Sequence, residues 1–182
     1  MYSYSIGSDP HPALAEARFA ILVPMEGLTF RLGTADDAAV LARHRCEMFL
    51  EMGTLSVEHY PELAQSSTAY FQDAIPNDHY RAWLVESGES IIAGAGMQIN
   101  TLPPRPRPNG SPLGLGPQGL ILNVFVEKDW RGRGIARELM RRIIDYARDE
   151  GLPSLALHAS DAGRPLYEQL GFQPTTEMRL FL

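Results

Sequence analysis

The residues that most directly indicate chemistry form the loop Arg131-Gly132-Arg133-Gly134-Ile135-Ala136, between an apolar segment ending at Val126 and a helical pattern beginning at Ile135. A strand, a tight glycine-containing loop and a helix N-terminus together bind phosphate. The first turn of a helix has unpaired amides and a partial positive charge, and glycines let an anion approach the backbone. The side chains of Arg131, Arg133 and Arg137 can add donors to a pyrophosphate. The alternative interpretation is a glycine-tolerant turn with exposed arginines.

Two other classes of phosphate-binding loop fit the chain less well. A nucleoside-triphosphate loop ends in Gly-Lys followed by Ser or Thr, and the sequence contains no such run. A literal G-x-G-x-x-G occurs at Gly114, Gly116 and Gly119, but it follows a proline-rich stretch, contains Pro117 and leads into a strand pattern. A dinucleotide-binding fingerprint must follow a strand and open a helix, so this match is coincidental.

Hydrophobic periodicity places regular elements around the loop. Segment 120–127 predicts a buried strand that leads into it, and 135–148 predicts the helix that follows and stops at Gly151. Elsewhere we predict strands at 28–32, 154–160 and 172–182, and a hairpin of 80–86 and 90–102 with Gly88 in its turn. We predict helices at 38–49, after a capping-box-like Thr34 and Asp37, at 57–75 and at 163–170. Segment 103–119 is predicted to be a proline-rich surface loop. This order predicts a single α/β domain with a mixed central sheet and helices on both faces.

A second pattern lies downstream of the loop, at Ser160-Asp-Ala-Gly-Arg-Pro-Leu-Tyr167-Glu-Gln-Leu-Gly171-Phe172. It resembles the Asn-x-x-Ala-x-x-Leu-Tyr-x-x-x-Gly-Phe stretch of the GCN5-related N-acetyltransferase superfamily, and Arg131-x-x-Gly134-x-Ala136 resembles that family's Gln/Arg-x-x-Gly-x-Gly/Ala motif. Either motif alone is moderately specific, whereas both at this separation form a strong signature. The resemblance implies an acetyltransferase domain at 27–182, preceded by an N-terminal extension at 1–26.

The resemblance also implies a cofactor and its contacts. The acyl donor would be acetyl-CoA, with no metal, and the acceptor a primary amine of a small molecule or peptide. The pantetheine arm would pair with the backbone of Val124, Phe125 and Val126, where an amide can polarise the thioester carbonyl. The pyrophosphate would be held by the backbone amides of Gly132, Arg133, Gly134, Ile135, Ala136 and Arg137.

Tyr167 matches the tyrosine that protonates the leaving thiolate in this family. That role is chemically reasonable, because phenol and thiol titrate near about 10 and 8.5. The alternative is a helix tyrosine packed on the sheet. Ser160 stands where the family usually has asparagine, and Gly163 where it often has alanine. A serine can still hydrogen-bond a pantetheine amide, with a shorter reach.

The general base is not evident from the sequence. Many relatives have a glutamate in the strand before the phosphate loop, but here that strand has Asn123, and a neutral amide is not a base. His158 is the leading substitute, because strand alternation would put it on the face of Ser160 and imidazole titrates near about 6.5. The alternatives are a core histidine with a structural role or a water chain with no dedicated base. Weaker carboxylate candidates are Glu47, Glu51 and Glu177.

Composition narrows the class of protein but does not identify the acceptor. A net charge of −6 argues against a nonspecific nucleic-acid binder. The single cysteine, Cys46, excludes an intramolecular disulfide. No apolar run is long enough to span a membrane. A start without a signal-peptide pattern favours the cytoplasm, and a homodimer is left open. Arg105 and Arg107 would favour an acidic acceptor, whereas Glu47, Glu51 and Glu58 would favour a cationic one. The competing classes are a noncatalytic acyl-CoA-binding domain and a nucleotide-dependent enzyme.

Overall fold

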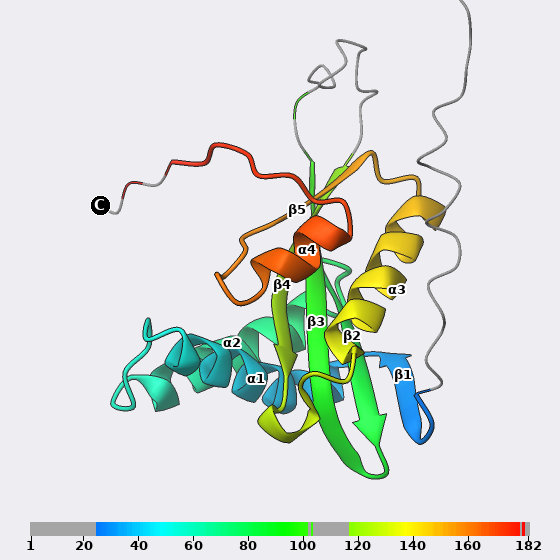
Figure 1. The fold of residues 1–182 in the computed structure, drawn as a ribbon. Helices are drawn as coiled ribbons and strands as arrows, with labels where there is room; N and C mark the ends of the chain where they lie inside the picture. The colour runs from blue at the N-terminus through cyan, green and yellow to red at the C-terminus, as the bar shows by residue number, and fades with distance from the viewer. Residues whose placement is uncertain (1–24, 102, 104–116, 179, 181–182) are drawn as a thin grey trace, which may run out of the picture.

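Five strands form one sheet in the order β1-β2-β3-β4-β5 (Figure 1). The computed structural model describes residues 25–101, 103, 117–178 and 180. Adjacent strands run antiparallel except β4 and β5, which are parallel, so the predicted mixed sheet is confirmed. The strands are β1 (Leu28–Leu32), β2 (Tyr80–Ser87), β3 (Ser90–Thr101), β4 (Pro117–Val126) and β5 (Ser154–Leu157).

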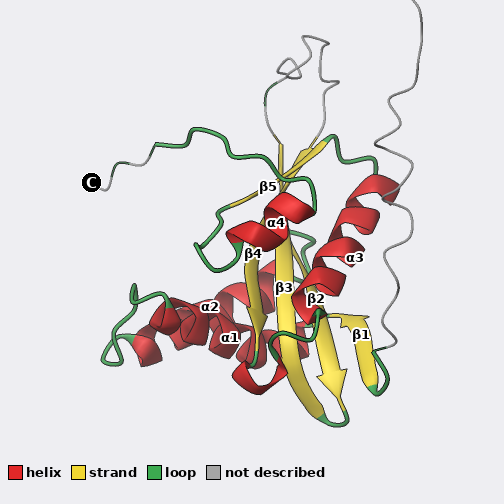
Figure 2. Cartoon of the chain, in the orientation of Figure 1, coloured by secondary structure: helices red, strands yellow, loops and turns green. Residues whose placement is uncertain are grey.

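Helices cover both faces of this sheet, as predicted (Figure 2). Helix α3 (Ile135–Asp149) buries Leu139 and Ile143 in the cluster that contains Val85 of β2. Helices α1 (Ala38–Glu51) and α2 (Tyr60–Ala74) form a second cluster with Leu84 of β2. Since neighbouring strand residues point to opposite faces, Leu84 and Val85 serve different cores. A short helix, α4 (Arg164–Gln169), follows β5.

Local signals placed most elements correctly. The backbone amide of Thr34 donates to Asp37 (2.8 Å) at the start of the 3-10 turn η3 (Ala35–Asp37) that leads into α1, as the predicted cap requires. Gly88 in the β2–β3 turn and Gly151 after α3 both have positive φ, at 59° and 68°. Glycine adopts this conformation without steric penalty.

Two predicted strand boundaries and one predicted strand are wrong. Strand β4 begins at Pro117, inside the predicted loop, because a proline is tolerated as the first residue of a strand. Strand β5 ends at Leu157, where its pairing with β4 stops. The described residues after α4, 172–178 and 180, form no strand, and Pro174 among them lacks the amide that a ladder needs. The predicted extension (apart from residues 25 and 26), Arg105, Arg107, Gly114 and Gly116 lie outside the described residues.

His44 docks α1 onto the sheet and is almost completely buried. Its Nε2 lies 3.5 Å from a carboxylate oxygen of Glu127 and 3.0 Å from Nη2 of Arg43, and its ring lies 4.9 Å from that of Phe125. Its Nδ1 has no hydrogen-bond partner among the described residues. Burial, reinforced by Arg43, lowers the pKa of His44 from 6.5 to about 4 despite the opposing effect of Glu127.

We expect His44 to make folding stability sensitive to mild acid. Its pKa is lower in the folded state than in the unfolded chain, so the unfolded chain binds more protons between pH 6.5 and about 4. The contribution of neutral His44 to the free energy of unfolding is therefore fully present above this window. It is lost as the pH decreases through the window, which lowers stability by about 3 kcal/mol at most. His44→Phe keeps an aromatic ring against Phe125 and removes the titration. Its free energy of unfolding, measured with urea, should change less across this window than that of the wild type, and equal changes would contradict the assignment.

Candidate active site

The sheet parts between β4 and β5. Their pairing ends at Ile121 and Leu157, so no strand of the described chain lies beside residues 122–126 of β4 on the β5 side. Within this stretch Asn123 has a φ of 56°, and the register with β3 shifts between Gly94 and Gly96. This is a β-bulge, a feature that terminates pairing and redirects the backbone. The backbone of Val124, Phe125 and Val126 thus lies beside an open sheet edge, where an extended ligand can add as a strand would.

The predicted phosphate loop follows directly. After the 3-10 turn η4 (Lys128–Trp130), Gly132 and Gly134 have φ of 74° and 81°, and Gly134 is the N-cap of α3. Among the described residues, a side chain at Gly132 would meet no atom within 4 Å, and one at Gly134 would meet only the methyl carbon of Met25 at 3.6 Å. The two glycines therefore leave space in front of a helix N-terminus. The backbone of Ile135, Ala136 and Arg137 begins that helix, so the loop fits an anionic phosphate group.

The three arginines of the loop have partners within the protein. Arg131 donates from Nε to the carbonyl of Val126 (2.8 Å) and from Nη2 to both carboxylate oxygens of Glu51 on α1 (2.9 and 2.8 Å). Nη2 of Arg133 donates to the carbonyl of Asp129, with the guanidinium 4.7 Å from the ring centre of Trp130. Arg137 donates to Gln169 of α4. In this structure Arg131 connects the loop to β4 and to α1, which is a structural role that the sequence did not predict.

The ion pair of Glu51 with Arg131 is expected to weaken phosphate binding. Lys128 also lies 3.7 Å from Glu51, so one carboxylate faces two cations of the loop. Glu51→Gln should raise the affinity for CoA about threefold, within the roughly 0.2–1 kcal/mol of an exposed ion pair, and the gain should shrink at high salt. Isothermal calorimetry with CoA measures both. The matched control is Glu47→Gln, because Glu47 lies on the same helix and accepts from the hydroxyl of Tyr60 instead. A lower affinity in Glu51→Gln would show that the ion pair holds the loop in its binding conformation.

Tyr167 lies on α4, packed against the core cluster of α3. Burial raises the pKa of its hydroxyl, so the group stays protonated at neutral pH and can donate. Its ring explains a departure from the family motif: a side chain at Gly163 would lie 2.8 Å from the ring and 3.3 Å from Oγ of Ser160. Oγ of Ser160 accepts from the backbone amide of Gly163 (3.2 Å), so this hydroxyl already holds the turn before α4.

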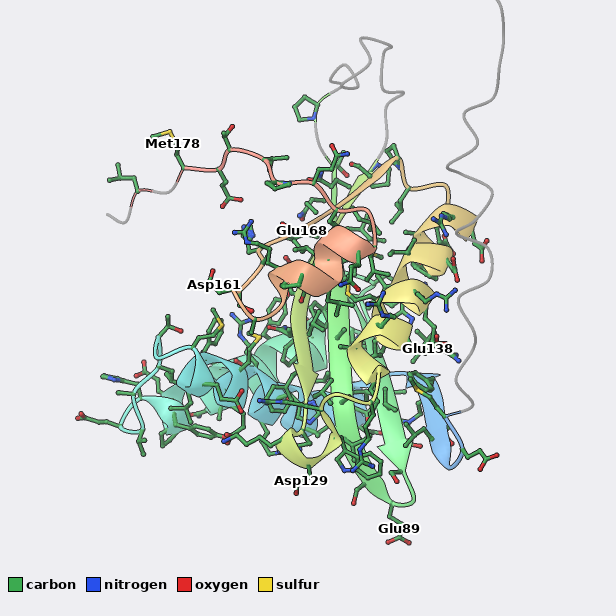
Figure 3. All side chains as sticks on the ribbon, in the orientation of Figure 1. Glu89, Asp129, Glu138, Asp161, Glu168 and Met178 are labelled. Atoms are coloured by element: carbon green, nitrogen blue, oxygen red, sulfur yellow. The ribbon has the colours of Figure 1, made fainter. Side chains whose placement is uncertain are left out.

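His158 is not a core histidine, because 40 % of its side chain is exposed. Its Nε2 lies 2.9 Å from a carboxylate oxygen of Glu177. Both residues line a hollow of roughly 530 Å³ that Tyr167 also lines. The strand argument for His158 and Ser160 is wrong, because β5 ends before either residue. The structure nevertheless brings the two predicted catalytic side chains, His158 and Tyr167, to one hollow together with Glu177. Glu168 of α4, labelled in Figure 3, also lines this hollow.

Asn123, which stands where many relatives have a glutamate, has a structural role. The Asn123 amide bonds with Arg45 and Tyr80, two partners that the sequence did not reveal. No pattern within β4 could identify them, since they come from α1 and β2.

Cys46 is buried, and among the described residues no three His, Cys, Asp or Glu side chains gather as a metal site. Nor does the described chain contain a helix with the length and apolar character that a membrane crossing requires.

Solved structures share this architecture. A GCN5-related N-acetyltransferase from Ralstonia eutropha superposes with a TM-score of 0.76 at 31 % identity, covering 86 % of this chain and 99 % of that one. A predicted acetyltransferase from Clostridium acetobutylicum, solved with acetyl-CoA, gives 0.70 at 27 % identity, covering 85 % and 96 %. The fold of the described residues is therefore that of the acetyltransferase class.

The family model agrees. Residues 46–172 match the acetyltransferase (GNAT) family, and the chain belongs to this family. The mycothiol acetyltransferase of Thermobifida fusca is 31 % identical over 174 residues, which cover 90 % of this chain and 47 % of that protein. A probable N-acetyltransferase family 8 member 5 of Mus musculus is 29 % identical over 65 % of this chain and 49 % of its own length. The chain spans about half the length of these curated relatives.

Proposed function

We propose that this chain transfers an acetyl group from acetyl-CoA to a primary amine. The observation that carries the proposal is the open edge of β4 at residues 122–126, which leads directly into a loop with two left-handed glycines at the N-terminus of α3. This combination offers an extended backbone for the pantetheine arm and amides for the pyrophosphate. Ser160 adds a hydroxyl near the turn before α4.

Acetyl-CoA supplies an acetyl group already activated as a thioester. The backbone at Val124 polarises the carbonyl, in the manner of an oxyanion hole. The amine nitrogen forms a bond to the carbonyl carbon while the carbon–sulfur bond breaks, giving an amide and a thiolate. Tyr167 gives its proton to the departing sulfur, and His158 removes the proton that the amine must lose. Glu177, 2.9 Å from Nε2 of His158, orients the imidazole. His158 then releases its proton to solvent, and solvent returns a proton to the oxygen of Tyr167.

An acceptor screen tests this function. Purified protein, acetyl-CoA and a panel of amines (amino acids, polyamines, amino sugars and peptides) are combined, and thiol release is followed. We expect at least one amine to give turnover. If none does while acetyl-CoA still raises the melting temperature, the protein is a noncatalytic acyl-CoA-binding domain. ATP that competes with CoA at matched low concentration would instead indicate a nucleotide-dependent enzyme.

A second test addresses His158. In His158→Ala the rate should no longer show the low-pH limb that titration of a general base produces, because the group that must lose its proton before the reaction is gone. The measurement is kcat/KM for the amine across the acid to neutral range. His79→Ala is the control, since His79 is exposed and lies in the turn before β2, outside the hollow. A limb retained in His158→Ala would assign the base elsewhere, with Glu47, Glu51, Glu177 and a water chain as the remaining candidates.

A further inference from the structure

The bulge of β4 requires support from outside the strand. Asn123 is one of only two described non-glycine residues with a positive φ, at 56°. Asparagine tolerates this left-handed conformation better than most residues, yet a strained backbone persists only when its surroundings hold it. Between the pairs Gly94–Phe125 and Gly96–Leu122, two residues of β4 oppose one residue of β3. The support must therefore come from side-chain contacts rather than from the ladder.

The side chain of Asn123 is held from two sides. Its Nδ2 donates to the hydroxyl of Tyr80 (2.8 Å), and its Oδ1 accepts from Nη1 of Arg45 (2.6 Å). Tyr80 belongs to β2 and crosses β3 at Gly96, where a side chain would lie 1.9 Å from the tyrosine oxygen. Complete burial raises the pKa of Tyr80, so its hydroxyl stays protonated and carries no proton away from the site. We call Arg45 and Tyr80, the two residues that hold the side chain of Asn123, the clamp. Of these two, Tyr80 is part of the buried core.

Arg45 is the accessible side of the clamp. It lies on α1, half-buried, with its guanidinium 4.7 Å from the ring centre of Phe49. Its neighbour Arg43 pairs with the carboxylate of Glu127 at 2.6 Å, whereas Arg45 donates to a neutral amide. No carboxylate among the described residues forms an ion pair with Arg45. The one hydrogen bond that its side chain forms with the described residues is directed at the bulge.

We propose that Arg45 is a positioning residue for acyl transfer: by holding the side chain of Asn123, it fixes the bulge and the orientation of the Val124 backbone that follows. The proposal rests on the proposed function, in which that backbone polarises the thioester carbonyl. A preorganised donor contributes only while its direction is maintained, and loss of one such donor lowers kcat by about 10²–10³-fold. A loosened bulge should lower kcat by about tenfold, a fraction of that loss. The phosphate loop, which provides CoA affinity, is not altered.

Arg45→Met removes the donor and keeps an unbranched stem against Phe49, and Arg45→Lys restores a donor. We expect kcat to fall about tenfold in Arg45→Met and to recover largely in Arg45→Lys, with the KM for acetyl-CoA unchanged. Arg43→Met, which removes a charge from the same helix, is the control for general electrostatic effects.

A double-mutant cycle separates positioning from direct contact with the acceptor. Asn123→Gly keeps the left-handed backbone accessible and removes the side chain that Arg45 holds. In this background Arg45→Met should have no further effect on kcat. An equal loss of kcat with and without Asn123 would overturn the proposal, since Arg45 would then act independently of the bulge.

Amide hydrogen exchange tests the clamp without turnover. Exchange in segment 122–126 should become faster in Arg45→Met, while exchange in the core of α3, at Ile143, stays unchanged. Unchanged exchange in segment 122–126 would overturn the proposal whether or not the enzyme turns over. If no amine gives turnover with the wild type but exchange rises as expected, the proposed function fails and the clamp stands.

Discussion

Tyr167→Phe is expected to lower kcat about a hundredfold while the KM for acetyl-CoA changes less than about threefold. The substitution removes one oxygen and keeps the ring, which packs 6.1 Å from the ring of Phe172 and against the space left by Gly163. Burial raises the pKa of the hydroxyl, so it stays protonated through neutral pH and the wild type should retain this contribution there. Steady-state kinetics with the best amine from the screen provide both parameters.

Tyr146→Phe controls for the removal of a phenol as such. Tyr146 lies on α3, where its hydroxyl accepts from Arg81 and its ring packs against Trp83, and it does not line the hollow. Its loss should reduce stability and leave kcat unchanged. An equal loss of kcat and of acetyl-CoA affinity in Tyr167→Phe would mean that the hydroxyl supports packing and binding rather than proton transfer. A different group would then protonate the sulfur.

The sequence predicted those parts of the site that depend on neighbours along the chain. The glycine loop with the helix that it opens is recognisable from the spacing of residues within one short stretch of sequence. The same is true of the stretch that contains the tyrosine on α4. The same holds for β2 and β3, whose turn at Gly88 has the positive φ that glycine permits. These elements therefore agree with the structure to within a few residues.

Contacts between distant segments were not predictable in this way. Arg131 and Glu51 are 80 residues apart, and nothing in the loop motif indicates that the arginine would face α1. The bulge at Asn123 depends on how β4 pairs with β3, and its support comes from α1 and β2. An asparagine in an otherwise apolar strand was the available signal: we interpreted it as a missing carboxylate, and the structure explains it as a left-handed residue.

The C-terminal segment shows the same limit. A strand was predicted at 172–182, but β5 has only four residues and offers few ladder bonds to a further strand. Figure 3 shows Met178 directed away from the sheet, and 97 % of this side chain is exposed. Glu177 nevertheless contacts His158, so this segment brings a carboxylate to the hollow without regular structure.

Gly134→Ala is expected to lower CoA affinity at least about tenfold, or roughly 1.4 kcal/mol. At a φ of 81° an L-residue is strained by about 1–2 kcal/mol, so alanine pushes the loop out of this conformation. The amides at the start of α3 then turn away from the position of the pyrophosphate, and the added methyl occupies the approach. The fold itself should tolerate the change, because the nearest atom to the new methyl is Cε of Met25 at 3.6 Å. Calorimetric titration with CoA measures the loss.

Gly151→Ala is the matched control, because Gly151 lies at the opposite end of the same helix with a φ of 68° and no atom within 4 Å of an added methyl. Both variants should lose similar stability in thermal unfolding, since both place alanine in the left-handed region. Only Gly134→Ala should lose affinity. If the two variants bind CoA equally well, backbone amides of this loop do not hold the pyrophosphate, and the arginine side chains become the alternative anchors. In that case Arg131 would have to leave Glu51, and Glu51→Gln would increase the affinity of Gly134→Ala as much as that of the wild type.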